Sequence, residues 1–273
     1  MRKSSRFFGT LCGILAAICY GTNPFGALNL YAEGMHTSSV LFYRFGLAWL
    51  IIAAVMVVRA IPRHGVVKES LRVSAKEFGA LSLLGGLFAV SSLTLYLSFH
   101  LMDAGVASTI LFTSPVMTAV IMAVFFREKI NWVTISSIAL SVIGVAMLYW
   151  GDGTATLPIV GVILVLLSAL SYALYIIVVN RTNLQMSSFK INFFVLFYCA
   201  IAMVAYSFIS GEALTLPPPL RSWFFVGWLA IVPAIMALVL MVYAAKYVGS
   251  TTTAILGALE PLTAVLIGIF VFG

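Results

Sequence analysis

The chain has 273 residues, of which 63% are hydrophobic and only 8% are charged. So little polar surface excludes a soluble globular protein of this size and indicates a protein of the lipid bilayer. The net charge of +7 does not indicate a nucleic-acid partner, because the basic residues are distributed as in a membrane protein.

Nine apolar segments are each long enough to form a membrane helix, which needs about 20 residues to cross roughly 30 Å of hydrocarbon. They cover residues 8–31, 38–59, 78–101, 104–126, 131–150, 157–180, 188–209, 222–246 and 250–272. We therefore expect an all-α integral membrane protein with short loops and no soluble domain.

The basic residues predict the orientation of these helices. If the N-terminus is cytoplasmic, thirteen of the fifteen Lys and Arg residues fall on the cytoplasmic side. This is the positive-inside pattern. We expect a multi-pass protein of the cytoplasmic (inner) membrane with a cytoplasmic N-terminus.

The first segment combines a packing surface with a predicted helix break. Gly9, Gly13 and Gly21 recur with Ala17 at every fourth position, a spacing that lets helices approach closely. Asn23 and Pro24 follow, and the proline predicts an interruption of the helix.

The second segment contains Arg44 about seven residues from its outer end, roughly 10 Å at 1.5 Å per residue. Its planar guanidinium is suited to clamp a substrate carboxylate. Two structural roles are alternatives for so long a side chain: snorkelling to the outer surface, or capping carbonyl groups of a neighbouring helix.

Polar and aromatic residues on later segments are candidates for an aromatic-walled substrate cavity. Tyr172 and Tyr175 share a helix face, as do Tyr96 and His100. Tyrosines near helix ends also form interfacial belts, which is the alternative. We expect His100, close to Asp103, to be a gate or surface residue, and we expect no metal site. The substrate-binding candidates on the tyrosine and amide set are Tyr20, Asn23, Tyr96, Tyr172, Tyr175 and Tyr243.

Glu260, in the last segment, is the strongest functional candidate. An acidic side chain near the middle of a span costs on the order of 2.5–3.5 kcal/mol to insert, so it faces a cavity or a partner. Pro261 beside it predicts a second break and a free Gly257 carbonyl. Glu260 could bind a substrate ammonium group or carry a coupled proton. The alternative is a structural carboxylate that bonds a hydroxyl or pairs with Arg44.

An internal repeat relates the two halves of the chain. Residues 107–126 correspond to 253–272, and in this alignment Ser114 and Pro115 match Glu260 and Pro261. Residues 9–20 correspond likewise to 161–172. Ser114 is therefore a further cavity candidate, and Pro115 predicts a third helix break.

An odd number of helices in each copy predicts that the second copy is inverted in the membrane. We assign residues 1–151 to the first repeat, with five helices, and residues 152–273 to the second, with four. The tenth helix, which would repeat 131–150, is missing. We expect that the sequence is truncated, and a natural nine-helix protein is the alternative.

The chain resembles the EamA type of the drug/metabolite transporter superfamily. The resemblance rests on Arg44 in Phe-Tyr-Arg-Phe, on Tyr96, on the Pro115 helix ending in Phe-Arg-Glu-Lys at 126–129, and on Gly144 in the next segment. It implies a ten-helix carrier fold with a central cavity and peripheral helices 5 and 10. It also favours a structural role for Arg44.

The expected function is secondary transport, with export of small organic metabolites such as amino acids by alternating access around a midplane cavity. A substrate gradient or proton exchange would drive it. We expect no catalytic residues, no cofactor, and a monomer or weak homodimer. The alternatives are a drug or nucleotide-sugar carrier of the same superfamily, an intramembrane enzyme acting on lipid, or a structural scaffold.

Overall fold

The structure is a computed structural model that describes residues 2–60, 72–127, 132, 135–136, 139, 158–182, 184, 186–217, 220–257 and 259–272. The described residues form helices and no strands. Eight of these helical spans are long and apolar enough to cross a membrane. The expected fifth helix, 131–150, lies almost entirely outside the described residues.

The eight spans lie close to the ranges predicted from hydropathy. The first is α1 (Arg2–Gly21) with α2 (Asn23–Ala32), followed by α3 (Thr37–Ala60) and α4 (Ala75–Ser98). The fourth is α5 (Ala104–Leu111) with α6 (Ser114–Phe126), and α8 (Ile159–Arg181) and α9 (Ser188–Ser210) come next. The seventh joins α10 (Leu220–Leu229), a π-helical segment η1 (Ala230–Met236) and α11 (Ala237–Val248), and the eighth comprises α12 (Ser250–Leu256), α13 (Leu259–Ile267) and η2 (Gly268–Phe272).

Three spans are interrupted where the sequence predicted a break. Pro24 and Pro115 lie in the first turns of α2 and α6, directly after the interruptions, and Pro261 follows the interruption between α12 and α13. Proline lacks an N–H and its ring clashes with the preceding turn, so a continuous helix cannot form there. One expected detail is wrong: the Gly257 carbonyl is not free, because it accepts a hydrogen bond from the Glu260 N–H at 2.9 Å.

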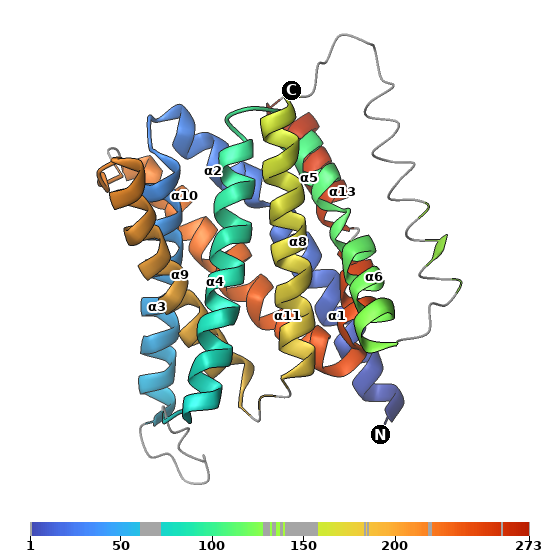
Figure 1. Cartoon of the computed structure of the whole chain (residues 1–273). Coiled ribbons are helices and arrows are strands. Elements are labelled where there is room, and N and C mark those ends of the chain that lie inside the picture. Colours follow the sequence, from blue (N-terminus) through green and yellow to red (C-terminus); the bar gives the residue numbers. More distant parts are fainter. Residues whose placement is uncertain are drawn as a thin grey trace.

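The helices stand side by side as a bundle, with the N-terminus at its lower end and the C-terminus at its upper end as viewed in Figure 1. Helix α1 runs upward from the N-terminus, whereas α8 runs downward. In space, α1 packs against α11, α4 against α8 and α3 against α9, while α5 packs against α13 and α6 against α12.

Small residues bring α1 close to its neighbours. A Cβ atom on Gly9 would lie 2.6 Å from the Tyr247 Cβ, and one on Gly13 would lie 2.6 Å from a Leu256 methyl carbon. Both glycines therefore serve the packing role predicted from their spacing.

Large apolar side chains cover the outside of the bundle. Phe125, Phe208 and Ile209 are 76%, 83% and 84% exposed, respectively. Such exposure would be unfavourable in water but is expected where lipid chains surround the protein. The interior, by contrast, contains fully buried Arg44, Tyr96 and Tyr175.

Candidate functional site

A cavity lies among helices from both halves of the chain. Its lining is strongly polar for the interior of a membrane protein, since it combines a cation, an acid, an amide, two serines and three tyrosines. The lining residues are Tyr20, Asn23, Arg44, Phe88, Ser91, Ser92, Leu95, Tyr96, Leu111, Tyr172 and Glu260. We call this cavity the polar chamber.

A second cavity adjoins the first and shares three of its lining residues, Leu111, Tyr172 and Glu260. It lies among four elements: the interrupted span of α5 and α6, the interrupted span of α12 and α13, and helices α8 and α11. The other residues that line it are Ser108, Phe112, Ser114, Ile176, Met241, Thr253, Ala254, Gly257 and Pro261. We call it the apolar chamber.

Glu260 lies at the junction of the two chambers because the chain is interrupted directly before it. The residue occupies the first turn of α13, where the helix dipole favours a negative charge. Among the described residues, no hydrogen bond or ion pair reaches its carboxylate. Neither of the structural contacts considered from the sequence, a hydroxyl partner or an ion pair with Arg44, is therefore present there.

Arg44 projects from α3 into the polar chamber and is only 1% exposed. Its Nη1 donates a hydrogen bond to the Tyr96 hydroxyl at 2.7 Å, and its Nη2 donates to the Pro233 carbonyl at 3.5 Å. The Arg44 side chain therefore does not snorkel to the outer surface. Instead it caps a carbonyl group of a neighbouring span, that of Pro233, which was the second structural role considered from the sequence. Among the described residues the Nε atom has no partner. Only two of the five N–H donors of the guanidinium are engaged, so Nε–H is one of three that remain for a ligand.

Tyr96 connects Arg44 to the first broken span. Its hydroxyl donates to the Asn23 Oδ1 at 3.1 Å while it accepts from Arg44. The side chains of α2, α3 and α4 are thus fixed relative to one another on one wall of the polar chamber.

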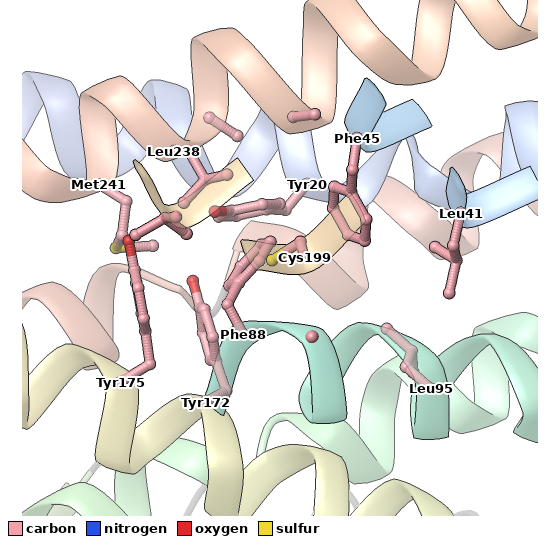
Figure 2. Close-up of a cluster of buried hydrophobic side chains, with 14 of the residues drawn as sticks. Tyr20, Leu41, Phe45, Phe88, Leu95, Tyr172, Tyr175, Cys199, Leu238 and Met241 are labelled. Atoms are coloured by element: carbon pink, nitrogen blue, oxygen red, sulfur yellow. The ribbon is translucent and has the colours of Figure 1, made fainter. Parts of the chain in front are cut away.

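Another part of the lining is aromatic. Figure 2 shows the rings of Tyr20, Phe88 and Tyr172 gathered between α1, α4 and α8. The rings of Tyr20 and Tyr172 meet edge to face with centroids 6.0 Å apart, and Tyr175 stacks on Tyr172 at 6.3 Å. The hydroxyl groups of Tyr20, Tyr172 and Tyr175 are all buried, and none has a partner within the part of the chain that the structure describes.

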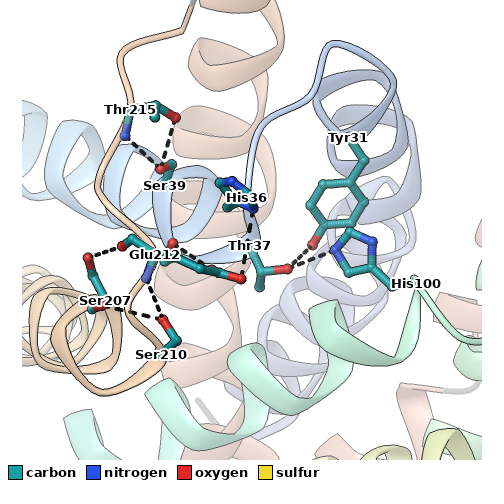
Figure 3. Close-up of polar contacts among 10 residues, drawn as sticks. Tyr31, His36, Thr37, Ser39, His100, Ser207, Ser210, Glu212 and Thr215 are labelled. Atoms are coloured by element: carbon teal, nitrogen blue, oxygen red, sulfur yellow. Dashed lines mark hydrogen bonds and ion pairs between the residues drawn. The ribbon is translucent and has the colours of Figure 1, made fainter.

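A separate polar network lies at the upper end of the bundle (Figure 3). His100 Nε2 and the Thr37 hydroxyl are 3.0 Å apart, the Tyr31 hydroxyl lies 3.1 Å from that of Thr37, and Tyr31 also donates to the Tyr96 carbonyl. Partial burial lowers the pKa of His100 from its ordinary value of 6.5, an effect that the Glu212 carboxylate opposes and His36 reinforces. This network joins α2, α3 and the end of α4.

Glu212 extends the same network to the segment after α9. It accepts a hydrogen bond from Ser38 at 3.1 Å and lies 3.8 Å from His36 Nδ1, and Thr215 donates its N–H to Ser39. These contacts tie the 210–217 segment to the start of α3 (Figure 3).

The structure brings together most of the sequence-predicted site residues, and it separates the rest. Tyr20, Asn23, Arg44, Tyr96, Tyr172 and Glu260 line the polar chamber, and Ser114 and Pro261 line the apolar chamber. Tyr175 packs behind Tyr172 and lines neither chamber. Tyr243 lies away from both and packs against Phe8 and Tyr247, while His100 belongs to the upper network.

The sequence analysis did not single out Phe88, Ser91 or Ser92. Phe88 and Ser92 lie eight and four residues before Tyr96 on α4, so the helical period that relates Tyr96 to His100 also points to them. Pro233 was missed as well, although a proline inside an apolar segment signals an interruption.

Residues that could hold a metal ion do not cluster: the described part of the chain contains no group of three or more His, Cys, Asp or Glu side chains. Cys12, Cys19 and Cys199 are buried and free, as expected of small packing residues.

Comparison with known proteins gives a consistent family. A sequence model of the EamA-like transporter family matches residues 7–150 and 159–273. An uncharacterized transporter of Archaeoglobus fulgidus is 26% identical over 97% of this chain and 88% of that protein. The uncharacterized inner membrane transporter YedA of Escherichia coli is 29% identical over 60% of this chain and 53% of its own length. One crystal structure superimposes with a TM-score of 0.73 at 17% identity, covering 97% of this chain and 88% of that chain, a likeness that concerns the fold alone.

Proposed function

The chain belongs to the EamA-like transporter family, and we propose that it is a secondary carrier that exports small organic metabolites such as amino acids. In this proposal the two chambers form the substrate site, which opens alternately to either side of the membrane. Proton exchange or the substrate gradient supplies the driving force.

One observation carries the proposal: Glu260 lines both chambers, and its carboxylate has no partner among the described residues. Glu260 is half-buried, and an acid without a partner is costly inside a membrane protein, so its presence there favours a function. A substrate ammonium group or a transported proton would satisfy it. Arg44, on the same chamber, would receive the carboxylate of a zwitterionic substrate through its free Nε donor.

The contacts between the halves support inverted repeats of residues 1–151 and 152–273. A two-fold axis requires that contacts be reciprocal. The first span of the first half packs against the third span of the second half, and the converse pair, α4 with α8, is also in contact. The corresponding spans α3 and α9 also pack together. The opposite directions of α1 and α8 in Figure 1 agree with this symmetry.

Charge supports a cytoplasmic location for the lower end of the bundle. Arg6, Lys76, Arg181, Lys190 and Lys246 lie near helix ends there, whereas Arg221 lies at the start of α10 near the upper end. Under the positive-inside rule, the N-terminus is then cytoplasmic and the upper network of Glu212 and His100 faces outward.

The alternative functions are less well supported by the lining of the chambers. A nucleotide sugar would require several cations for its phosphates, and Arg44 is the one basic residue among those that line either chamber. An intramembrane enzyme would need a second acid or a histidine at the same depth, and the lining contains neither.

Flux measurements in proteoliposomes test this proposal. Glu260→Gln should abolish the response of amino acid flux to a pH gradient while the fold is kept, because the amide cannot exchange a proton. Asp103→Asn is the matched control: Asp103 caps α5 through one oxygen, Oδ1, and an asparagine can keep that cap. Unchanged pH-driven flux in Glu260→Gln would remove Glu260 from coupling, and absence of flux for every metabolite would refute the transport proposal.

A further inference from the structure

The two chambers differ in the charged and amide side chains that line them, although they share a wall. Charged and amide groups other than Glu260 are confined to the polar chamber, where Arg44 and Asn23 lie. In the apolar chamber, the side chains beyond the junction are mainly hydrocarbon, contributed by Phe112, Ile176 and Met241 among others.

The hydroxyl groups of the apolar chamber add little polarity. The Thr253 hydroxyl donates to the Gly249 carbonyl at 2.7 Å, so its proton is already engaged within its own helix. Ser108 and Ser114 contribute only small hydroxymethyl groups. A ligand in this chamber would therefore be held mainly by burial of apolar surface.

The junction fixes how a ligand could occupy both chambers. Glu260 and Tyr172 line both cavities, so a cationic group bound at Glu260 sits at the boundary between them. From that point Arg44 and Asn23 are reached on one side, and Ile176 and Met241 on the other. An anionic group of the ligand belongs in the polar chamber, and its uncharged remainder belongs in the apolar one.

We propose that the apolar chamber is the specificity subsite for the apolar part of the cargo, and that Ile176 is a specificity-determining residue within it. This inference rests on the proposed transport function. It assigns the cargo a charged head and an apolar tail, with the tail length limited by Ile176 of α8, Met241 of α11 and Phe112 beside the break between α5 and α6.

Ile176 is suited to this role by its place on α8. It is fully buried, it lies four residues after Tyr172 on the same face of the helix, and it lines the apolar chamber together with Tyr172 and Glu260. Truncation of its side chain would lengthen the chamber without touching Arg44 or Glu260.

The adjacent Ile177 provides a matched control. It is 4% exposed in the same helix but lines neither chamber. Ile177→Ala therefore removes the same atoms from an equally buried position, and any general loss of stability should be comparable.

The test uses three radiolabelled amino acids that share one head group: alanine, leucine and tryptophan. Flux into proteoliposomes is measured for the wild-type protein, Ile176→Ala and Ile177→Ala, and results are expressed as the tryptophan-to-alanine ratio, which is independent of the amount of folded protein. We expect Ile176→Ala to raise this ratio about tenfold, the scale on which pocket hydrocarbon discriminates substrates, and Ile177→Ala to leave it unchanged. A second variant, Ala254→Val, narrows the same chamber and should lower the ratio.

The possible failures are distinguishable. Flux by the wild-type protein with an unchanged ratio in Ile176→Ala, or an equal change in Ile177→Ala, overturns the subsite and leaves the transport function intact. No flux of any of the three amino acids by the wild-type protein overturns the amino acid cargo and the subsite together.

Discussion

At the residue scale, Arg44 shows how a cation is kept inside the bundle with no acidic partner among the residues that the structure describes. Hydrogen bonds to Tyr96 and Pro233 satisfy two of its nitrogen atoms, and its Cζ lies 5.2 Å and 5.3 Å from the ring centroids of Phe45 and Tyr96. Such ring faces attract cations, most strongly where water is absent. The guanidinium is thus stabilised while its charge remains available to a substrate anion.

Tyr96→Phe should expose the dependence of this arrangement on one hydroxyl group. The change leaves Arg44 Nη1 and Asn23 Oδ1 without their partner, which should lower the free energy of unfolding by about 1–3 kcal/mol. The measurement is thermal unfolding in detergent. Tyr243→Phe is the control, because this tyrosine also belongs to a membrane span but lines neither chamber. Equal stability of the two variants would contradict the structural role given to the Tyr96 hydroxyl.

His100 makes the upper network sensitive to acid. Since burial lowers the pKa of this imidazole from 6.5, the unfolded chain binds the proton more readily than the folded protein, and stability falls as the pH drops below about 6.5. His100→Gln should therefore lose less thermal stability than the wild-type protein between pH 7 and pH 5. Parallel curves for the two proteins would show that another group causes the acid response.

The residues that carry a buried charge could be predicted from the sequence, and those that only shape the cavity could not. A charged side chain inside an apolar segment is costly unless it faces a cavity or a partner, so the sequence alone identifies Glu260 and Arg44 as candidates. Ser91, Ser92 and Phe88 are ordinary residues of a membrane helix, and their exposure to the chamber depends on how α4 is rotated. Tyr243 shows the converse, because the sequence made it a cavity candidate although its helix presents it to Phe8.

At the element scale, the interrupted helices place functional groups at mid-depth. The break before α13 leaves Glu260 in a first turn, and the break before α6 does the same for Ser114. Helix ends inside a membrane are tolerated only where their backbone groups face protein or a cavity. Both chambers lie next to these breaks.

Gly21 permits the close approach of α1 to the broken helix α13. A Cβ atom at this position would meet the side chain of Thr263 and lie 2.6 Å from the Glu260 carbonyl oxygen. Gly21→Ala should therefore displace α13, lower stability by about 1–3 kcal/mol and reduce flux. Gly46→Ala is the control on α3, where no atom lies within 4 Å and alanine should be neutral or stabilising. Similar behaviour of the two variants would contradict the close packing at Gly21.

The spans and their three predicted breaks follow from local rules, since length, apolar composition and proline act within one segment. The π-helical segment η1 around Pro233 does not follow from such local rules. There the chain keeps a helical path instead of separating into two helices, and the Arg44 contact to the Pro233 carbonyl comes from a different part of the sequence. Propensity alone could not distinguish a π-helical segment from a complete break.

At the scale of the whole molecule, we propose that two related halves enclose a site that opens in turn to each side of the membrane. The reciprocal packing of α1 with α11 and of α4 with α8 would let the halves rock about α3 and α9 without breaking the symmetry of the bundle. The upper network, which joins Glu212 to Ser38 across the halves, would then be a set of contacts that breaks when the site opens outward.

The most direct measurement is the accessibility of a single cysteine in the polar chamber. Ser92→Cys is introduced after Cys12, Cys19 and Cys199 are replaced by alanine, and a membrane-impermeant thiol reagent is applied to right-side-out and inside-out vesicles. We predict that the reagent labels Ser92→Cys in both kinds of vesicle, that is, from both sides of the membrane. Ser168→Cys, at a fully buried position that lines neither chamber, should stay unlabelled. Labelling of Ser92→Cys from one side only, or no more than in Ser168→Cys, would contradict alternating access.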